Sequence, residues 1–134
     1  MIYIKNKAEV YLERILKIKP YYISEVLLKL KSKFPNDNPY PLVKLYIEKG
    51  LLNDRVLIKF EMNYLIKCKL VSKKYVYNYF TNKGLSYNLI KYTLDMFSDF
   101  DEINYKENVK LLEKKGKGKT YITNYLKRKG FDEL

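Results

Sequence analysis

Hydrophobic residues recur along the sequence three and four positions apart, the spacing that places them on one face of an α-helix. The resulting stripes lie within residues 11–16, 23–30, 42–47, 57–68, 75–80, 89–97, 111–112 and 122–126. No run of alternating apolar and polar residues is long enough to predict a β-sheet. The pattern therefore predicts an all-α protein.

Residues that favour helix ends stand between these stripes. Small polar side chains, which can accept hydrogen bonds from the free N–H groups of a first turn, are expected to cap four helices: Ser24, Asn53 or Asp54, Ser72 and Ser86. Glycines are expected just after three helices: Gly50, Gly84 and Gly130. The three prolines within residues 34–41 exclude a helix interior there.

The sequence repeats itself at intervals of 46 to 50 residues. Residues 75–85 and 121–131 both read Y-[VI]-x-N-Y-[FL]-x-x-K-G-[LF], and weaker matches appear at offsets of 47 and 50. This periodicity predicts a tandem array of three three-helix repeats, elongated and curved, in which each repeat buries its core against its neighbours. We expect repeats at residues 1–49, 50–97 and 98–134, the last one truncated before its third helix.

The composition excludes several classes of function. The chain has 134 residues, no His and one Cys, so neither a His-dependent nucleophile nor a His-containing zinc site can be built from it, and Cys68 has no internal disulfide partner. No apolar run approaches the ~20 residues that span a bilayer. The N-terminal residues also lack the apolar stretch of a signal peptide. We therefore expect a cytoplasmic protein with no cofactor and no membrane partner.

Positive charge is abundant and unevenly distributed. There are 27 Lys and Arg against 15 Asp and Glu, a formal net charge of +12. Only three of the basic residues are Arg, so a genome rich in A and T is one explanation for the excess of Lys. That explanation does not account for two acid-free stretches, residues 63–94 with six Lys and residues 114–129 with seven basic residues. Basic surfaces of this kind favour nucleic acid or an acidic protein as a partner.

The repeat resembles a known family, the RecX regulatory proteins that modulate the RecA recombinase. The resemblance is carried by G-L-L-N-D at residues 50–54, by V-S-K-K-Y-V-x-x-Y-F-x-x-K-G-L at residues 71–85 and by the basic segment 115–131. The sequence departs from the family pattern at Asn53, where an acid is usual, at Ser72, where Gly is usual, and at the pair Leu57-Ile58, where an aromatic residue and Ala are usual.

The resemblance implies a monomeric protein of three three-helix repeats that lies in the groove of the RecA–single-stranded DNA filament. There it would limit filament growth, strand exchange, ATP hydrolysis and co-protease activity, without catalytic residues of its own. Double-stranded DNA is a further candidate ligand.

Basic residues of the two acid-free stretches are the candidates for contact with the filament or DNA. They are Lys67, Lys69, Lys73, Lys74, Lys83, Lys115, Lys117, Lys119, Lys127, Arg128 and Lys129. Tyr77 and Tyr121 are candidates for stacking on bases or packing at an interface, although core packing explains many of the 15 tyrosines equally well.

Two other functions remain open. One is a general nucleic-acid-binding protein without RecA specificity, using residues 72–94 in the manner of a helix-turn-helix. The other is an enzyme whose clustered carboxylates Asp99, Asp101 and Glu102 bind a divalent cation; the alternative for these three is an acidic helix start, favoured by the helix dipole.

Overall fold

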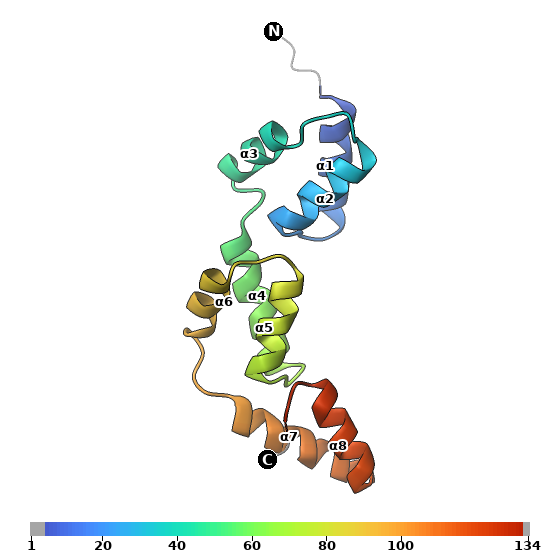
Figure 1. Ribbon diagram of the computed structural model, residues 1–134, viewed down its shortest axis with the longest axis vertical. Helices are drawn as coiled ribbons and strands as arrows, with labels where there is room; N and C mark the ends of the chain where they lie inside the picture. The colour runs from blue at the N-terminus through green and yellow to red at the C-terminus, as the bar shows by residue number, and fades with distance from the viewer. Residues whose placement is uncertain (1–4, 133–134) are drawn as a thin grey trace. The chain divides into compact units, whose positions relative to one another are not determined.

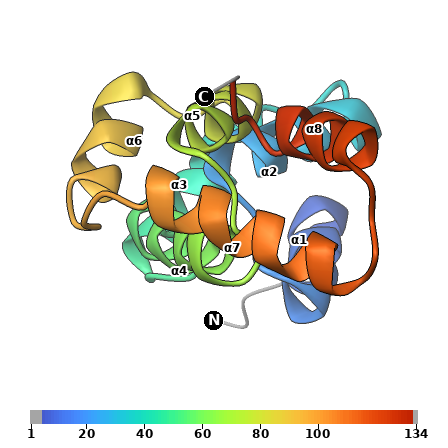
Figure 2. The same ribbon diagram turned by 90° about the horizontal axis from the view of Figure 1, so that it is seen from below.

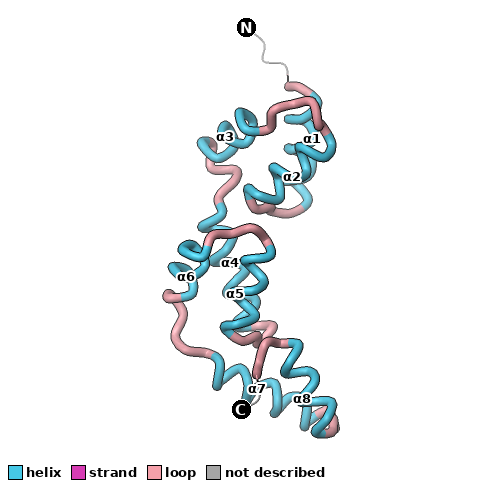
Figure 3. Tube along the Cα trace, viewed as in Figure 1, coloured by secondary structure: helices cyan, strands magenta, loops and turns pink. Residues whose placement is uncertain are grey.

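The computed structural model describes residues 5–132, and within this range the ordered elements are α-helices joined by loops and turns, without a β-strand (Figures 1 and 3). The helices are α1 (Lys7–Ile18), α2 (Ile23–Lys33), α3 (Tyr40–Glu48), α4 (Asp54–Lys67), α5 (Lys73–Asn82), α6 (Tyr87–Leu94), α7 (Asp101–Lys114) and α8 (Lys119–Arg128). The all-α prediction is confirmed.

The helices follow the period read from the sequence. The helices α1, α4 and α7 begin at residues 7, 54 and 101, which gives a spacing of 47 residues twice. The helices α5 and α8 begin 46 residues apart, at 73 and 119. By its internal contacts the chain divides into two compact units, residues 1–57 and 58–134, so the repeat boundaries at 49/50 and 97/98 stay a prediction.

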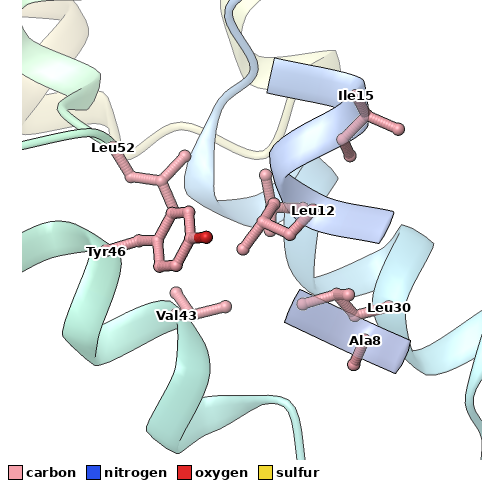
Figure 4. Close-up of a cluster of buried hydrophobic side chains, with 8 residues drawn as sticks. Ala8, Leu12, Ile15, Leu30, Val43, Tyr46 and Leu52 are labelled. Carbon is pink, nitrogen blue, oxygen red and sulfur yellow. The ribbon is translucent and has the colours of Figure 1, made fainter. Parts of the chain in front are cut away.

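Each unit has its own apolar core. In the first unit, side chains from α1, α2 and α3 converge on one cluster (Figure 4), in which Leu12 and Val26 are fully buried. In the second unit, Val76 and Phe80 of α5 and Ile90 of α6 are fully buried. The apolar stripes predicted within α1, α2, α5 and α6 therefore correspond mainly to buried helix faces, as expected for amphipathic helices. The stripe predicted within residues 57–68 is wrong in part: Phe60 and Tyr64 are 77% and 47% exposed, and the buried face of α4 is formed by Ile58, Met62, Leu65 and Ile66.

Most of the predicted helix ends are confirmed. The side chains of the predicted caps accept hydrogen bonds from first-turn N–H groups of α4, α5 and α6 at 3.1 to 3.3 Å; these caps are Asn53, Ser72 and Ser86. The glycines predicted to follow α3, α5 and α8 all have positive φ, at +75°, +82° and +88°: Gly50, Gly84 and Gly130.

The prediction of Ser24 as an N-cap is wrong, because α2 begins at Ile23, two residues before the start that a cap at Ser24 would give. Tyr22 is its N-cap, and two carboxylates take the role expected of a serine. The Glu25 side chain accepts a hydrogen bond from the backbone N–H of Tyr22 at 3.0 Å. The Asp54 side chain accepts one from the N–H of Ile23 at 2.9 Å.

This use of Asp54 recurs in the second unit. Asp101 accepts a hydrogen bond from the backbone N–H of Lys73, the first residue of α5, at 2.7 Å. Asp54 is the first residue of α4 and Asp101 the first of α7. The aspartate that begins each of these helices thus caps the helix two elements earlier in the chain.

Removing the Asp54 acceptor is expected to destabilise the fold. Burial raises the pKa of Asp54 above its ordinary value of 3.8; the Ile23 hydrogen bond opposes this shift and Glu25 adds to it. Asp54→Ala should lower the free energy of unfolding by about 1 kcal/mol, the usual loss for a helix cap. Asp54→Asn keeps an acceptor and should cost little.

The pH dependence tests the same side chain. With a raised pKa in the folded state, the fold binds the proton more tightly than the unfolded chain does. The contribution of Asp54 to the free energy of unfolding should therefore fall as pH rises from 3.8 through the raised pKa. Urea unfolding across this pH range should show this fall in the free energy of unfolding for the parent protein and not for Asp54→Asn. If the free energy of unfolding depended on pH identically in the two proteins, Asp54 would not be the group responsible.

Candidate nucleic-acid interface

The start of α5 and the end of α8 are held together by hydrogen bonds. The backbone N–H of Ser72 donates to the carbonyl of Lys129 at 3.0 Å, and the Ser72 hydroxyl donates to the carbonyl of Gly130 at 2.7 Å. The Lys129 Nζ donates to the carbonyl of Lys69 at 3.0 Å. These contacts join the two acid-free stretches, which are remote in sequence, within the second unit.

A pocket of about 330 Å³ opens beside this junction. One side is formed by α5, through Lys74, Tyr75, Asn78, Tyr79 and Asn82. The other side is formed by the end of α8 and the residues after it, Lys127, Arg128, Gly130, Phe131 and Asp132. We call this set of residues the basic pocket.

Positive charge dominates the basic pocket. Lys74, Lys127 and Arg128 contribute three cations against the single carboxylate of Asp132. The Lys74 Nζ lies 3.2 Å from a carboxylate oxygen of Asp132, and both side chains are largely exposed. Exposed pairs of this kind contribute at most about 1 kcal/mol, so an external anion can replace Asp132.

Tyrosine rings and cations lie in contact around the pocket. Lys83 lies 5.6 Å from the ring centroid of Tyr79, and the ring of Tyr79 stacks on that of Tyr75 at 6.2 Å. On α8, the guanidinium of Arg128 lies 5.8 Å from the ring centroid of Tyr125. Cation–π contacts of this kind hold the charges at the tyrosine surface while leaving them in water.

Comparison with known proteins identifies the fold. The chain is similar to the crystal structure of regulatory protein RecX, with a TM-score of 0.71 and 18% sequence identity. The chain has the RecX fold. The match covers 94% of this chain and 66% of the RecX chain, so this sequence spans slightly less than two thirds of that protein's length. No protein-family model and no curated protein match the sequence.

The RecX-like arrangement places some of the predicted basic residues together and leaves others apart. Lys74, Lys127 and Arg128 line the basic pocket, and Lys69 and Lys129 meet at the adjacent junction. The remaining candidates lie outside the pocket, at helix ends or in turns: Lys67, Lys73, Lys83, Lys115, Lys117 and Lys119. Their contact with a partner stays a prediction.

The two predicted stacking residues differ in their surroundings. The ring of Tyr77 is half-buried and stacks on Tyr87 of α6 at 5.6 Å, so it packs within the second unit. Burial, followed by the influence of Tyr87, raises the pKa of Tyr77. Tyr121 is 44% exposed, stacks on Tyr125 at 6.4 Å and has Lys117 4.8 Å from its ring centroid. Of the two, Tyr121 is the one with ring surface open to a ligand.

The carboxamide and carboxylate side chains of the pocket, Asn78, Asn82 and Asp132, were not among the site residues predicted from the sequence. A signal for the two asparagines was present, because Lys74, Asn78 and Asn82 are spaced by four and therefore share one face of α5. Nothing in the sequence indicated that Asp132 would lie beside Lys74.

Two of the three carboxylates considered for a cation site are engaged in other contacts. Asp101 caps α5, and Glu102 forms an ion pair with Lys106 at 2.8 Å, a hydrogen bond that lowers the pKa of Glu102. Within residues 5–132 no cluster of His, Cys, Asp or Glu has the composition of a metal site. In the same range no helix is both long and apolar enough to cross a membrane.

Proposed function

We propose that this chain is a non-enzymatic regulator of the RecA–single-stranded DNA filament that inhibits or modulates its recombinase, ATPase and co-protease activities. The similarity of the fold to regulatory protein RecX over 94% of the chain is the observation that carries this proposal. The regulator acts as a monomer in the cytoplasm.

The charge distribution supports this role. The filament offers DNA phosphates, which attract Lys and Arg through long-range Coulomb forces and speed association. Most of the basic residues here are Lys, whose compact charge suits phosphate better than the bidentate recognition of a base that Arg provides. Contact with backbone phosphates supplies affinity that does not depend on the DNA sequence, which fits a protein that must act anywhere along a filament.

The direct test is the DNA-dependent ATPase of a bacterial RecA on single-stranded DNA, titrated with this protein. Inhibition at amounts well below one protein per RecA subunit is expected, since a filament regulator does not need to cover the DNA. A DNA-binding protein of similar charge serves as the control. Inhibition only at saturating coverage would instead indicate a general nucleic-acid-binding protein, and no inhibition would reject both functions.

Charge reversal in the two acid-free stretches should weaken this inhibition. Lys73→Glu with Lys74→Glu, or Lys117→Glu with Lys119→Glu, is expected to raise the concentration for half-inhibition about tenfold, because each pair replaces attraction by repulsion. Helicity should persist, since Lys73, Lys74 and Lys119 lie in the first turns of α5 and α8, where an acid is favourable, and Lys117 lies just before α8.

The matched control reverses two exposed lysines of the first unit, Lys31→Glu with Lys44→Glu. This variant carries the same change in net charge and should inhibit nearly as well as the parent. If all three double variants behave alike, net charge alone governs the effect and the acid-free stretches have no special role.

A further inference from the structure

Two rows of side chains, one exposed and one half-buried, run along the face of α5 that borders the basic pocket. Lys74, Asn78 and Asn82 are spaced by four residues, so neighbouring side chains lie about 6 Å apart. Tyr75 and Tyr79 form the adjacent row, with their rings stacked at an interplanar angle of 15°. A cation, two carboxamides and two aromatic rings thus line the same pocket.

Each of these groups matches one part of a nucleotide. Lys74, with Arg128 opposite, supplies charge for a phosphate. The exposed carboxamides of Asn78 and Asn82 can donate to and accept from the edge of a base, as Asn does in its paired contacts with adenine. Tyrosine rings stack on bases of any sequence. The pocket volume of about 330 Å³ lies at the lower end of small-ligand sites.

We propose that the basic pocket binds a nucleotide unit of single-stranded nucleic acid, with the phosphate at Lys74 and Arg128 and the base edge at Asn78 and Asn82. The proposal rests on the proposed function, because it names which part of a nucleoprotein filament this surface contacts. It also assigns a role to residues that the charge pattern alone does not single out.

The carboxamides beside aromatic rings favour nucleic acid over an acidic peptide. An acidic peptide would use the three cations and could hydrogen-bond to the Asn carboxamides through its backbone, but it has no base to stack on the tyrosine rings. A duplex also fits poorly, since its bases are stacked and paired, whereas proteins that bind single strands combine a basic track with aromatic side chains. The pocket has both of these features on adjacent helix rows.

Asp132 is the internal competitor for the phosphate. Its carboxylate lies 3.2 Å from the Lys74 amine, the place assigned to the phosphate. The pair is exposed, so its displacement costs little. Asp132→Asn should therefore raise the affinity for single strands about two- to fivefold, by removing both the competing contact and a negative charge.

The test is fluorescence anisotropy with the full chain and four labelled probes: a short deoxyadenosine oligonucleotide, an abasic strand with the same number of phosphates, a duplex, and polyglutamate. The parent protein should bind the oligonucleotide about tenfold more tightly than the abasic strand, the preference expected from contacts with one base. Asn78→Ala with Asn82→Ala should reduce this preference to about twofold.

Asn124→Ala is the matched control. Asn124 occupies the position of Asn78 in the repeated motif, 46 residues later, and is exposed on α8 without lining the pocket. This variant should keep the full preference for strands with bases. A loss as large as in the α5 double variant would overturn the assignment of the base to Asn78 and Asn82.

The failure of this inference can be told apart from that of the proposed function. If the parent binds oligonucleotide and abasic strand equally, or binds polyglutamate as tightly as either, the nucleotide pocket is wrong, while ATPase inhibition tests the regulator independently. A base preference that depends on Asn78 and Asn82 supports the pocket even if RecA is unaffected, and in that case only the regulatory function fails.

Discussion

Gly130→Ala is expected to lower the free energy of unfolding by about 3 kcal/mol. Gly130 has a φ of +88°, a region that costs other residues about 1–2 kcal/mol. An added Cβ would also lie 2.2 Å from the Ser72 Oγ, 2.8 Å from the Tyr75 Cβ and 3.0 Å from the Tyr75 backbone nitrogen. The last two atoms belong to the first turn of α5 and cannot move without it.

Gly116→Ala separates the cost of a positive φ from the cost of the steric contacts of the added Cβ. Gly116 follows α7 with a φ of +78°, and a Cβ built there meets no atom within 4 Å. Its substitution should cost only the conformational part, about 1 kcal/mol. Urea unfolding followed by circular dichroism would measure both variants. If Gly130→Ala and Gly116→Ala lowered the free energy of unfolding equally, the end of α8 would not be in close contact with α5. That result would remove the basis for the basic pocket.

The helices and their repetition could be predicted because they depend on local information. Apolar residues at helical spacing identify the buried face, and Val76 and Phe80 are indeed fully buried. Ser72 and Ser86 could be recognised as caps, because their partners lie within the following turn. Ser24 was misjudged in part because one of the two acceptors that stabilise the start of α2, Asp54, lies 31 residues away.

The candidate site could be predicted only in outline. The acid-free stretches indicated where positive charge gathers, and Lys74, Lys127 and Arg128 do share one pocket. These residues lie close together because Ser72 donates hydrogen bonds to the end of α8. Neither the hydropathy pattern nor the charge pattern of the sequence predicts that contact. The family resemblance treats Ser72 as a departure from glycine, whereas in this fold its hydroxyl makes one of the bonds that close the junction.

Two buried asparagines of α7 also make long-range hydrogen bonds that the sequence pattern does not predict. Asn104 and Asn108 are each only 4% exposed, although a polar residue in a helix would ordinarily be assigned to the surface. The Asn104 carboxamide donates to the carbonyls of Ile66 and Val71 at 3.0 and 2.9 Å. That of Asn108 donates to the carbonyl of Leu70 at 2.8 Å. Together the two side chains donate hydrogen bonds to backbone carbonyls at the end of α4 and in the turn between α4 and α5.

This turn needs such support because its conformation is unusual. Leu70 has a φ of +54°, a region that non-glycine residues rarely adopt, and it comes two residues before the cap of α5. The carboxamides fix the backbone on both sides of Leu70, and they therefore position Ser72 for its bonds to α8. The basic pocket thus depends on two side chains that do not line it.

Asn104→Leu is accordingly expected to lower the free energy of unfolding by about 3 kcal/mol. The leucine fills a similar volume but leaves the carbonyls of Ile66 and Val71 without this donor, and each buried unsatisfied group costs about 1–3 kcal/mol. Asn63→Leu, at an exposed position of α4, is the control and should change stability by less than about 0.5 kcal/mol.

The same substitution should also act at a distance. With the turn released, hydrogen exchange at the Ser72 amide, which donates to Lys129, should speed up in Asn104→Leu before the core amides of α4 respond. Binding of single-stranded oligonucleotide should weaken in parallel, because the two sides of the basic pocket are no longer held together. A stable Asn104→Leu protein with unchanged exchange at Ser72 would show that packing alone, without the buried carboxamides, sets the path of the chain into α5.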